Sequence, residues 1–262
     1  MLALIAGQGA LRGPVAEAAP DPPLICALEP YRPEGLDVDK SFRIERLGGF
    51  LHWLKARGVT RICMCGRVRR PEIRFTRLDW RTALMLPAIR RAIRRGDDGA
   101  LRIVISLLEE AGFEVVGAHE VAPALLMPEG VATRAQPGPD LARDIALADR
   151  ISVDQGRADL GQACVIREGR VVVQEDDAGT DAMLARLPEA APGTGGILFK
   201  GPKFRQERRA DLPVIGPNTA KGAIRAGLSG IVIDARGVMV LDRPALLRRL
   251  DEAGLFLLAR KV

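Results

Sequence analysis

The chain opens with Leu2-Ala3-Leu4-Ile5-Ala6-Gly7-Gln8-Gly9-Ala10-Leu11-Arg12-Gly13, the stretch that decides the fold of its first half. The apolar run predicts a buried strand, and the glycines after it predict a tight loop that opens a short helix. Glycines let a ligand approach the backbone closely, and a helix N-terminus can receive phosphate. The spacing G-x-G-x-x-x-G differs from the usual dinucleotide fingerprint. The loop therefore predicts a nucleotide site without identifying the nucleotide.

Strand-like and helix-like segments alternate over the rest of the first half. Further strands are predicted at 24–28, 61–65 and 113–116, and helices at 47–57, 80–95 and 99–111. This alternation predicts the α/β class, with a Rossmann-like open parallel sheet covered by helices.

The second half has a different organisation. Residues 128–140 are rich in glycine and proline, so we predict an N-terminal domain over 1–130, a linker over 131–140 and a C-terminal domain over 141–262. The predicted C-terminal elements are a helix at 141–155, strands at 163–167, 170–174, 231–234 and 238–241, a helix at 244–252 and a last strand. This domain is expected to be mixed α/β.

Composition narrows the classes of partner and location. The net charge of +6 favours an anionic partner, while an aromatic content of only 4% argues against single-stranded nucleic acid. The four cysteines lack the spacing of a zinc site, which predicts buried free thiols. No signal peptide or bilayer-spanning stretch is visible. We therefore expect a cytoplasmic protein whose membrane contact, if any, is peripheral, and no nucleic-acid partner.

The most basic part of the chain leads to Asp211 through Lys200, Lys203, Arg205, Arg208 and Arg209. Arginine forks and lysine point charges suit a pyrophosphate, and an acid among them could hold a metal ion or orient water. The alternative is an ordinary solvated charged face.

Two strand ends carry further candidates. The basic loop Gly66-Arg67-Val68-Arg69-Arg70-Pro71 follows a strand, at the usual ligand edge of an open α/β sheet. His119, beside Glu120, follows another strand and is either a ligand contact or a buried structural histidine. With two histidines in the chain, a catalytic metal would need mainly oxygen ligands, which suits magnesium or manganese.

An acidic cluster surrounds Gly179-Thr180 and consists of Glu175, Asp176, Asp177 and Asp181. The simplest interpretation is a strand-to-helix turn with Thr180 as the N-cap and Asp181 in the first turn.

Several motifs together resemble a known family, the UDP-2,3-diacylglucosamine pyrophosphatases of the lipid A pathway found in bacteria that lack the calcineurin-like enzyme. The resemblance extends over nearly the whole chain. It is carried by the motifs at 4–11, 66–71, 114–120, 159–162, 179–184, 203–216, 226–231 and 240–243. One departure is Ala178, which stands where the family commonly has a second glutamate.

The resemblance implies hydrolysis of UDP-2,3-diacylglucosamine to UMP and 2,3-diacylglucosamine 1-phosphate, with water attacking the β-phosphorus. It implies magnesium or manganese as cofactor, Asp211 as catalytic residue and metal ligand, peripheral contact with the inner membrane, and a possible homodimer. The substrate-binding residues that it implies are Gly9, Ala10, Leu11, Gly66, Arg67, Val68, His119, Glu120, Gln162, Glu175, Thr180, Asp181, Lys200, Lys203, Gln206, Arg209 and Thr219.

Two other functions remain open at this point. Glu29 follows the second predicted strand, where an NAD(P)-dependent oxidoreductase places its ribose-binding acid. A basic nucleic-acid- or membrane-binding protein is the other alternative; scarce aromatics and the lack of a basic amphipathic helix disfavour it.

Overall fold

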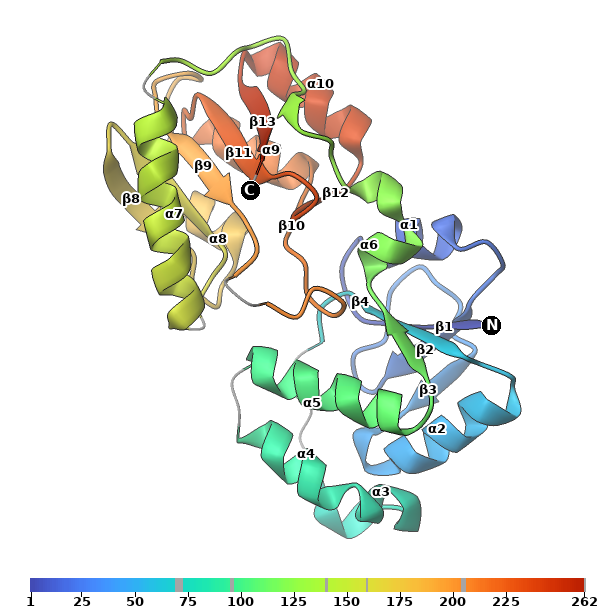
Figure 1. The fold of residues 1–262 in the computed structure, drawn as a ribbon. Coiled ribbons are helices and arrows are strands. Elements are labelled where there is room, and N and C mark those ends of the chain that lie inside the picture. The colour runs from blue at the N-terminus through green and yellow to red at the C-terminus, as the bar shows by residue number, and fades with distance from the viewer. Residues whose placement is uncertain (69–72, 95–96, 140, 159, 204–205, 262) are drawn as a thin grey trace. The chain divides into compact units, whose positions relative to one another are not determined.

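The computed structural model describes residues 1–68, 73–94, 97–139, 141–158, 160–203 and 206–261. The chain forms two compact units (Figure 1). Unit 1 comprises Met1–Pro123 and Glu207–Asp211, and unit 2 comprises Ala124–Gln206 and Leu212–Val262. The segment Glu207–Asp211 thus packs with unit 1 although the residues on both sides of it in the sequence belong to unit 2.

Unit 1 is built on a five-stranded sheet in which every pairing is parallel. Its strands are β1 (Leu2–Ala6), β2 (Leu24–Leu28), β3 (Lys40–Phe42), β4 (Arg61–Cys65) and β5 (Glu114–Val116), in the order β3-β2-β1-β4-β5. The order reverses between β1 and β4, which makes this pair the topological switch point. The predicted Rossmann-like open parallel sheet is confirmed.

Helices cover both faces of this sheet. The chain forms α1 (Arg12–Ala18), α2 (Leu47–Ala56), α3 (Trp80–Leu84), α4 (Leu86–Ile93), α5 (Asp97–Glu110) and α6 (Ala118–Val121). On one face, α2 and α5 pack on alternate strand residues, including Ala3, Cys26 and Ile62. Figure 1 shows α6 and α1 on the opposite side of the sheet from α2 and α5.

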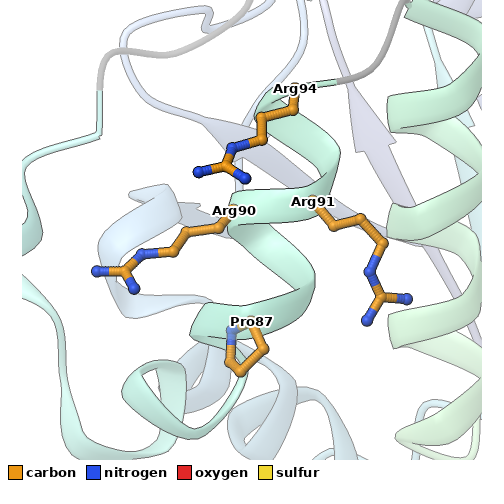
Figure 2. Close-up of a pocket in the computed structure, with 4 residues that line it drawn as sticks. All are labelled: Pro87, Arg90, Arg91 and Arg94. Atoms are coloured by element: carbon orange, nitrogen blue, oxygen red, sulfur yellow. The ribbon is translucent and has the colours of Figure 1, made fainter.

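The single helix predicted over 80–95 is two helices, because Pro87 lies at the start of α4. A proline lacks the amide hydrogen that a continuous helix needs, and its ring clashes with the preceding turn. α4 buries Ile89 and exposes Arg90, Arg91 and Arg94 (Figure 2).

Unit 2 contains a mixed six-stranded sheet, as predicted for this half. Its strands are β6 (Gly130–Val131), β7 (Ala163–Arg167), β8 (Arg170–Gln174), β9 (Ile197–Lys200), β11 (Gly230–Asp234) and β13 (Phe256–Arg260), in the order β6-β13-β11-β9-β7-β8. The three central strands β13, β11 and β9 are parallel, and the outer pairings are antiparallel. A separate short parallel pair joins β10 (Val214–Ile215) and β12 (Met239–Val240).

Helices cover both faces of this sheet. α7 (Leu141–Arg157) packs on one face, against Cys164, Phe199 and Val232. The other face packs against α8 (Thr180–Ala185), α9 (Pro217–Arg225) and α10 (Arg243–Ala253). The inward residues alternate along each strand, as expected for a sheet that is buried on both faces.

The segment predicted as a linker contributes to the structure of unit 2. β6 pairs antiparallel with β13, and the Ala132 amide donates to the Leu257 carbonyl at 2.9 Å. The Thr133 hydroxyl in turn accepts from the Leu257 amide at 2.8 Å. Glycine and proline here mark a short edge strand and its turns, so β6 extends the sheet of unit 2 and the next two residues add hydrogen bonds to it.

All four cysteines are buried and free, as predicted. Burial raises the pKa of the Cys26, Cys65 and Cys164 thiols to about 12, so they are protonated and inert at neutral pH. None of the helices in the described part of the chain is long and apolar enough to cross a bilayer.

A charged network fixes the carboxyl edge of the unit 2 sheet. Arg260, at the end of β13, donates to Asp234 at 2.7 Å and to both carboxylate oxygens of Asp149 on α7 at 2.6 and 2.9 Å. Asp234 is buried. Burial raises the Asp234 pKa, and the adjacent Arg260 charge opposes that rise.

Substitution Arg260→Met should lower the free energy of unfolding by about 3 kcal/mol at neutral pH, because it leaves Asp234 buried without a partner. The difference in the free energy of unfolding between variant and wild type should shrink as the pH falls. A buried carboxyl with a raised folded-state pKa destabilises the fold only while it is ionised. Far-ultraviolet circular dichroism in urea at two pH values measures both effects. The control Arg134→Gln removes an ion pair of 3.7 Å whose arginine is 88% exposed, and should cost under about 1 kcal/mol. If the two variants lost the same free energy of unfolding, the buried pair of Arg260 and Asp234 would have no special structural role.

Candidate functional site

The loops after β1 and β4 are joined by reciprocal backbone hydrogen bonds. The Gln8 amide donates to the Arg67 carbonyl at 2.9 Å, and the Arg67 amide donates to the Gln8 carbonyl at 2.7 Å. One residue earlier, the Gly7 amide donates to the Cys65 carbonyl at 2.8 Å. The two loops therefore form one rigid unit at the switch point of the unit 1 sheet.

Two glycines make this close approach possible. A Cβ at Gly7 would lie 2.6 Å from the Arg67 carbonyl oxygen. A Cβ at Gly66 would lie 2.9 Å from the Gln8 carbonyl oxygen, and Gly66 has a φ of +90°, which other residues rarely adopt. Both contacts are with backbone atoms that cannot rotate away.

The joined loops bring six predicted substrate-binding residues to one edge of the sheet. They are Gly9, Ala10 and Leu11 after β1, and Gly66, Arg67 and Val68 after β4. Arg12 holds the first loop through hydrogen bonds from its guanidinium to the carbonyls of Gly9 and Glu34. The carboxyl edge at a switch point is where open α/β sheets bind nucleotides. Glu29 lies directly after β2, as the oxidoreductase alternative requires.

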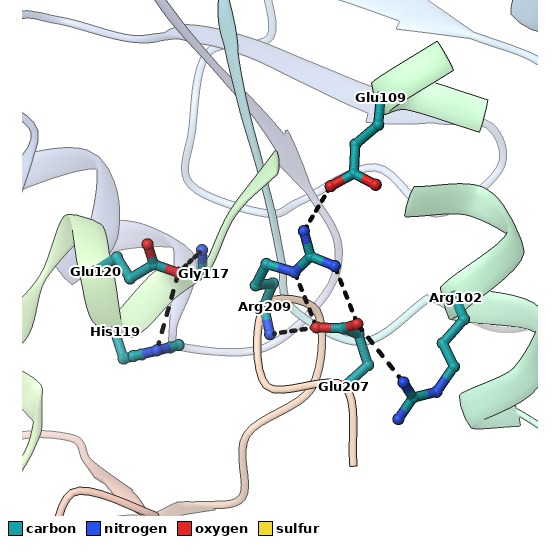
Figure 3. A network of polar contacts seen from close by, with 7 residues as sticks. All are labelled: Arg102, Glu109, Gly117, His119, Glu120, Glu207 and Arg209. Atoms are coloured by element: carbon teal, nitrogen blue, oxygen red, sulfur yellow. Dashed lines mark hydrogen bonds and ion pairs between the residues drawn. The ribbon is translucent and has the colours of Figure 1, made fainter. Parts of the chain in front are cut away.

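His119 lies near the same edge, in the short helix α6 that follows β5. Its Nδ1 atom is buried and has no hydrogen-bond partner among the described residues. Burial lowers the His119 pKa, and nearby Arg208 lowers it further, while Glu120 raises it. The ring is therefore neutral at pH 7. Glu120 accepts from the Gly117 amide at 2.9 Å and lies 3.9 Å from His119 Nε2 (Figure 3).

The segment Glu207–Asp211 is held on unit 1 by a charged network (Figure 3). Arg209 donates to Glu207 at 2.9 and 3.1 Å and to Glu109 on α5 at 2.6 Å. Arg102 on α5 lies 3.9 Å from Glu207. The hydrogen bonds from Arg209 lower the Glu207 pKa, and both carboxylates raise the Arg209 pKa. Part of the basic run is therefore compensated inside unit 1.

Asp211 ends this segment and is half-buried; its amide donates to the Glu207 carbonyl at 3.1 Å. No three His, Cys, Asp or Glu side chains in the described part of the chain come close enough to share a metal ion. A magnesium ion needs fewer protein ligands than three, since it usually takes one or two carboxylates together with water and substrate phosphates. The half-buried Asp211 carboxylate is an oxygen ligand of the kind that such an ion takes.

Unit 2 gathers four other predicted residues around a buried polar chain. Lys200, at the end of β9, donates to the Thr180 hydroxyl at 2.5 Å, and Thr180 donates to Glu175 at 2.8 Å. The other carboxylate oxygen of Glu175 accepts from the backbone amide of Gln162 at 2.8 Å. All three charged or hydroxyl side chains are buried. The side-chain oxygen of Gln162 is also buried, with no hydrogen-bond partner in the described structure.

The remaining predicted residues of unit 2 occupy turns and helix starts. Asp181 is exposed in the first turn of α8. The Gln206 side chain accepts from the Lys203 amide at 2.9 Å and so closes its own turn. Thr219 accepts from the Gly216 amide at 3.3 Å, in a cap of α9. The motif residues 69–71, 159, 204 and 205 lie outside the described residues.

Sequence reasoning missed the residues that position the site. The glycine motif begins at Gly7, so the sequence marked this residue as part of the loop. Its close contact with the β4 loop, almost sixty residues away, could not be predicted. Arg12 is the one charged residue of the glycine loop and Glu207 lies in a basic run, and the sequence does not show what either pairs with. These residues act through the loops that they hold.

The comparisons with known proteins cover both units. Residues 1–125 match the model of the LpxI N-terminal domain, and residues 128–258 match that of the LpxI C-terminal domain. The UDP-2,3-diacylglucosamine pyrophosphatase LpxI of Caulobacter vibrioides is 40% identical over 269 residues, which cover 98% of this chain and 96% of that protein.

Substitution Gly66→Ala should destabilise unit 1 by about 2 kcal/mol, because the new Cβ meets backbone at a strained φ. Both tryptophans, Trp53 and Trp80, lie in unit 1, so fluorescence in urea reports on this unit. The control Gly13→Ala adds a Cβ with no atom within 4 Å, in the helix α1, and should stabilise by about 0.5 kcal/mol. A Gly66→Ala protein as stable as the wild type would show that the two loops are not locked together.

Proposed function

Since the chain belongs to the LpxI family, we propose that it hydrolyses UDP-2,3-diacylglucosamine to UMP and 2,3-diacylglucosamine 1-phosphate, a step of lipid A biosynthesis. In this reaction the oxygen of water bonds to the β-phosphorus. The bond from that phosphorus to the bridging oxygen breaks, and UMP leaves. The observation that carries the proposal is the pair of locked glycine loops at the switch point of unit 1, in a chain similar to this family along 98% of its length.

The locked loops suit the nucleotide part of the substrate. Gly9, Ala10 and Gly66 carry no side chain beyond a methyl group, so a uridine diphosphate can lie against the backbone there. Arg67 adds an exposed cation from the β4 loop. Because these loops are fixed before the ligand arrives, binding loses little conformational entropy. Buried His119 Nδ1 offers a further acceptor, since the neutral ring protonated on Nε2 leaves Nδ1 free of hydrogen.

Asp211 is the residue that we assign to the reacting phosphorus. Its half-buried carboxylate lies at the end of a segment that ion pairs hold on α5. A carboxylate there can orient the attacking water. Magnesium held by Asp211 and phosphate oxygens would neutralise negative charge on the pyrophosphate. Lys203 and Arg209 are cations that we also assign to substrate phosphates, on the resemblance to the family.

The buried chain in unit 2 suits a polar part of the substrate. Lys200 is a buried cation whose hydrogen bond to Thr180 continues to Glu175, so its ammonium is fixed in direction. The Gln162 side-chain oxygen, buried and unsatisfied in the described structure, can accept a hydrogen bond from a sugar hydroxyl or amide. We assign Gln162, Glu175, Thr180 and Lys200 to substrate binding on these grounds, and Asp181, Gln206 and Thr219 on the resemblance to the family.

The oxidoreductase alternative has one structural point in its favour, the position of Glu29 after β2. Against it, α1 has only seven residues, and the first loop lacks the dinucleotide spacing. The family match over both units favours the pyrophosphatase. The substrate carries two acyl chains, so we also propose that the protein works peripherally at the cytoplasmic face of the inner membrane. A homodimer is a further proposal, which rests on the resemblance to the family alone.

Substitution Asp211→Ala should lower turnover by about a hundredfold or more, because Asp211 acts on the transition state, while substrate binding persists. The assay measures UMP release from micellar UDP-2,3-diacylglucosamine with magnesium. In water enriched in heavy oxygen, the label should appear in the lipid 1-phosphate and be absent from UMP.

Glu207→Gln is the matched control for this loop. It weakens the ion pairs with Arg209 and Arg102 and keeps the shape of the side chain, so turnover should fall less than tenfold. Near-normal turnover in a folded Asp211→Ala protein would remove Asp211 from the mechanism. No UMP from the wild type would refute the proposed reaction.

A further inference from the structure

Unit 1 exposes a group of large apolar side chains that its core does not use. Among the described residues, Phe75 is 48% exposed, Trp80 68%, Leu84 76% and Ile93 47%. They lie within twenty residues of one another, in the turn 75–77 and the helices α3 and α4. An exposed apolar cluster of this kind usually marks an interaction site.

The same stretch is strongly basic. Residues 73–94 contain six arginines and one acid, Asp79, whose carboxylate accepts from the Thr82 and Gly49 amides. In the described part of the chain, Arg90, Arg91 and Arg94 form no ion pair. Figure 2 shows these three side chains extending from α4 in different directions. Their charges are therefore available to an external partner.

Two adjoining hollows and two ring contacts link most of these apolar and basic side chains. Pro87, Arg90, Arg91 and Arg94 line a hollow of about 520 Å³ on α4. A neighbouring hollow of about 530 Å³ shares Pro87 and Arg91 and adds Arg81 and Leu84. Arg90 lies 5.9 Å from the Phe75 ring, and Arg81 lies 4.6 Å from the Trp80 ring. We call this surface, made of residues 74–94, the α3–α4 surface.

We propose that the α3–α4 surface docks unit 1 on an anionic lipid bilayer. Trp, Phe and Leu enter the interfacial region of a bilayer, and arginines beside them bind lipid phosphates. The sequence prediction that the chain lacks a basic amphipathic helix is wrong: α4 is one. Its eight residues and the break at Pro87 hide it from a search for long helical periods.

Two other partners fit this surface less well. Bases of single-stranded nucleic acid could stack on Phe75 and Trp80, but the exposed aliphatic side chains of Leu84 and Ile93 would have no role in such a complex. A second copy of the chain in a twofold contact would place the same arginines opposite one another, where they repel. The inference deepens the proposed function and rests on it in one respect: a diacylated substrate resides in the bilayer that the surface would contact.

Vesicle binding tests the proposal without substrate. The wild type should co-sediment with vesicles of equal parts phosphatidylcholine and phosphatidylglycerol, and bind pure phosphatidylcholine at least tenfold more weakly. Trp80 fluorescence should shift to shorter wavelength on binding. Arg90→Glu/Arg91→Glu should weaken binding more than tenfold, since each basic residue contributes roughly fivefold at an anionic surface. Trp80→Ser/Leu84→Ser should weaken it similarly and abolish the shift.

The control Leu160→Ser/Val172→Ser removes two exposed apolar side chains of unit 2 and should bind as the wild type does. UMP release from micellar substrate should be unchanged in all these variants. The release assay therefore tests the proposed reaction, and vesicle binding tests the docking surface separately. Full vesicle binding by both α3–α4 variants would overturn the proposal. Two other results would also overturn it, if the wild type does not bind vesicles. One is self-association that the α3–α4 variants abolish, and the other is oligonucleotide binding that they abolish.

Discussion

The structure of the candidate site depends on one contact between two backbones: the reciprocal hydrogen bonds of Gln8 and Arg67. They are possible because Gly7 and Gly66 carry no Cβ where each loop meets the other. The contact lies at the switch point of a parallel sheet, so two loops far apart in sequence become a single rigid edge. The segment Glu207–Asp211 is held on unit 1 by ion pairs with α5, and Glu120, beside His119, accepts from the Gly117 amide, so this part of unit 1 is largely preformed.

Much of the fold follows from local sequence patterns. The buried strands β1, β2, β4 and β7 were predicted at their observed bounds, because short apolar runs ended by turn residues are a strong signal. Short elements gave no such signal. β3 and β6 have three and two residues and are strands only because β2 and β13 pair with them. The predicted helix over 80–95 failed at Pro87, and recognising that break would have revealed α4 as a short basic helix.

The class of ligand of the candidate site could be predicted from the sequence, but the pairing of its charged side chains could not. Glycine loops and cations at strand ends indicated a phosphate ligand, because backbone access and positive charge are what phosphates need. Charge pairing was not predictable. Arg209 looked free in the sequence, but Glu109, a hundred residues away, and Glu207 compensate it. The buried chain from Lys200 through Thr180 to Glu175 likewise joins residues from β9, α8 and the end of β8, which only the sheet brings together.

Amide hydrogen exchange with and without nucleotide tests the central claim, that the locked loops of unit 1 bind a uridine nucleotide. Saturating UDP should slow exchange at residues 9–11 and 66–68, and NAD at the same concentration should leave these amides unchanged. Slowing requires that the ligand bind the native loops, where it adds stability by mass action. Protection by NAD alone, or UDP protection confined to other parts of the chain, would contradict the account.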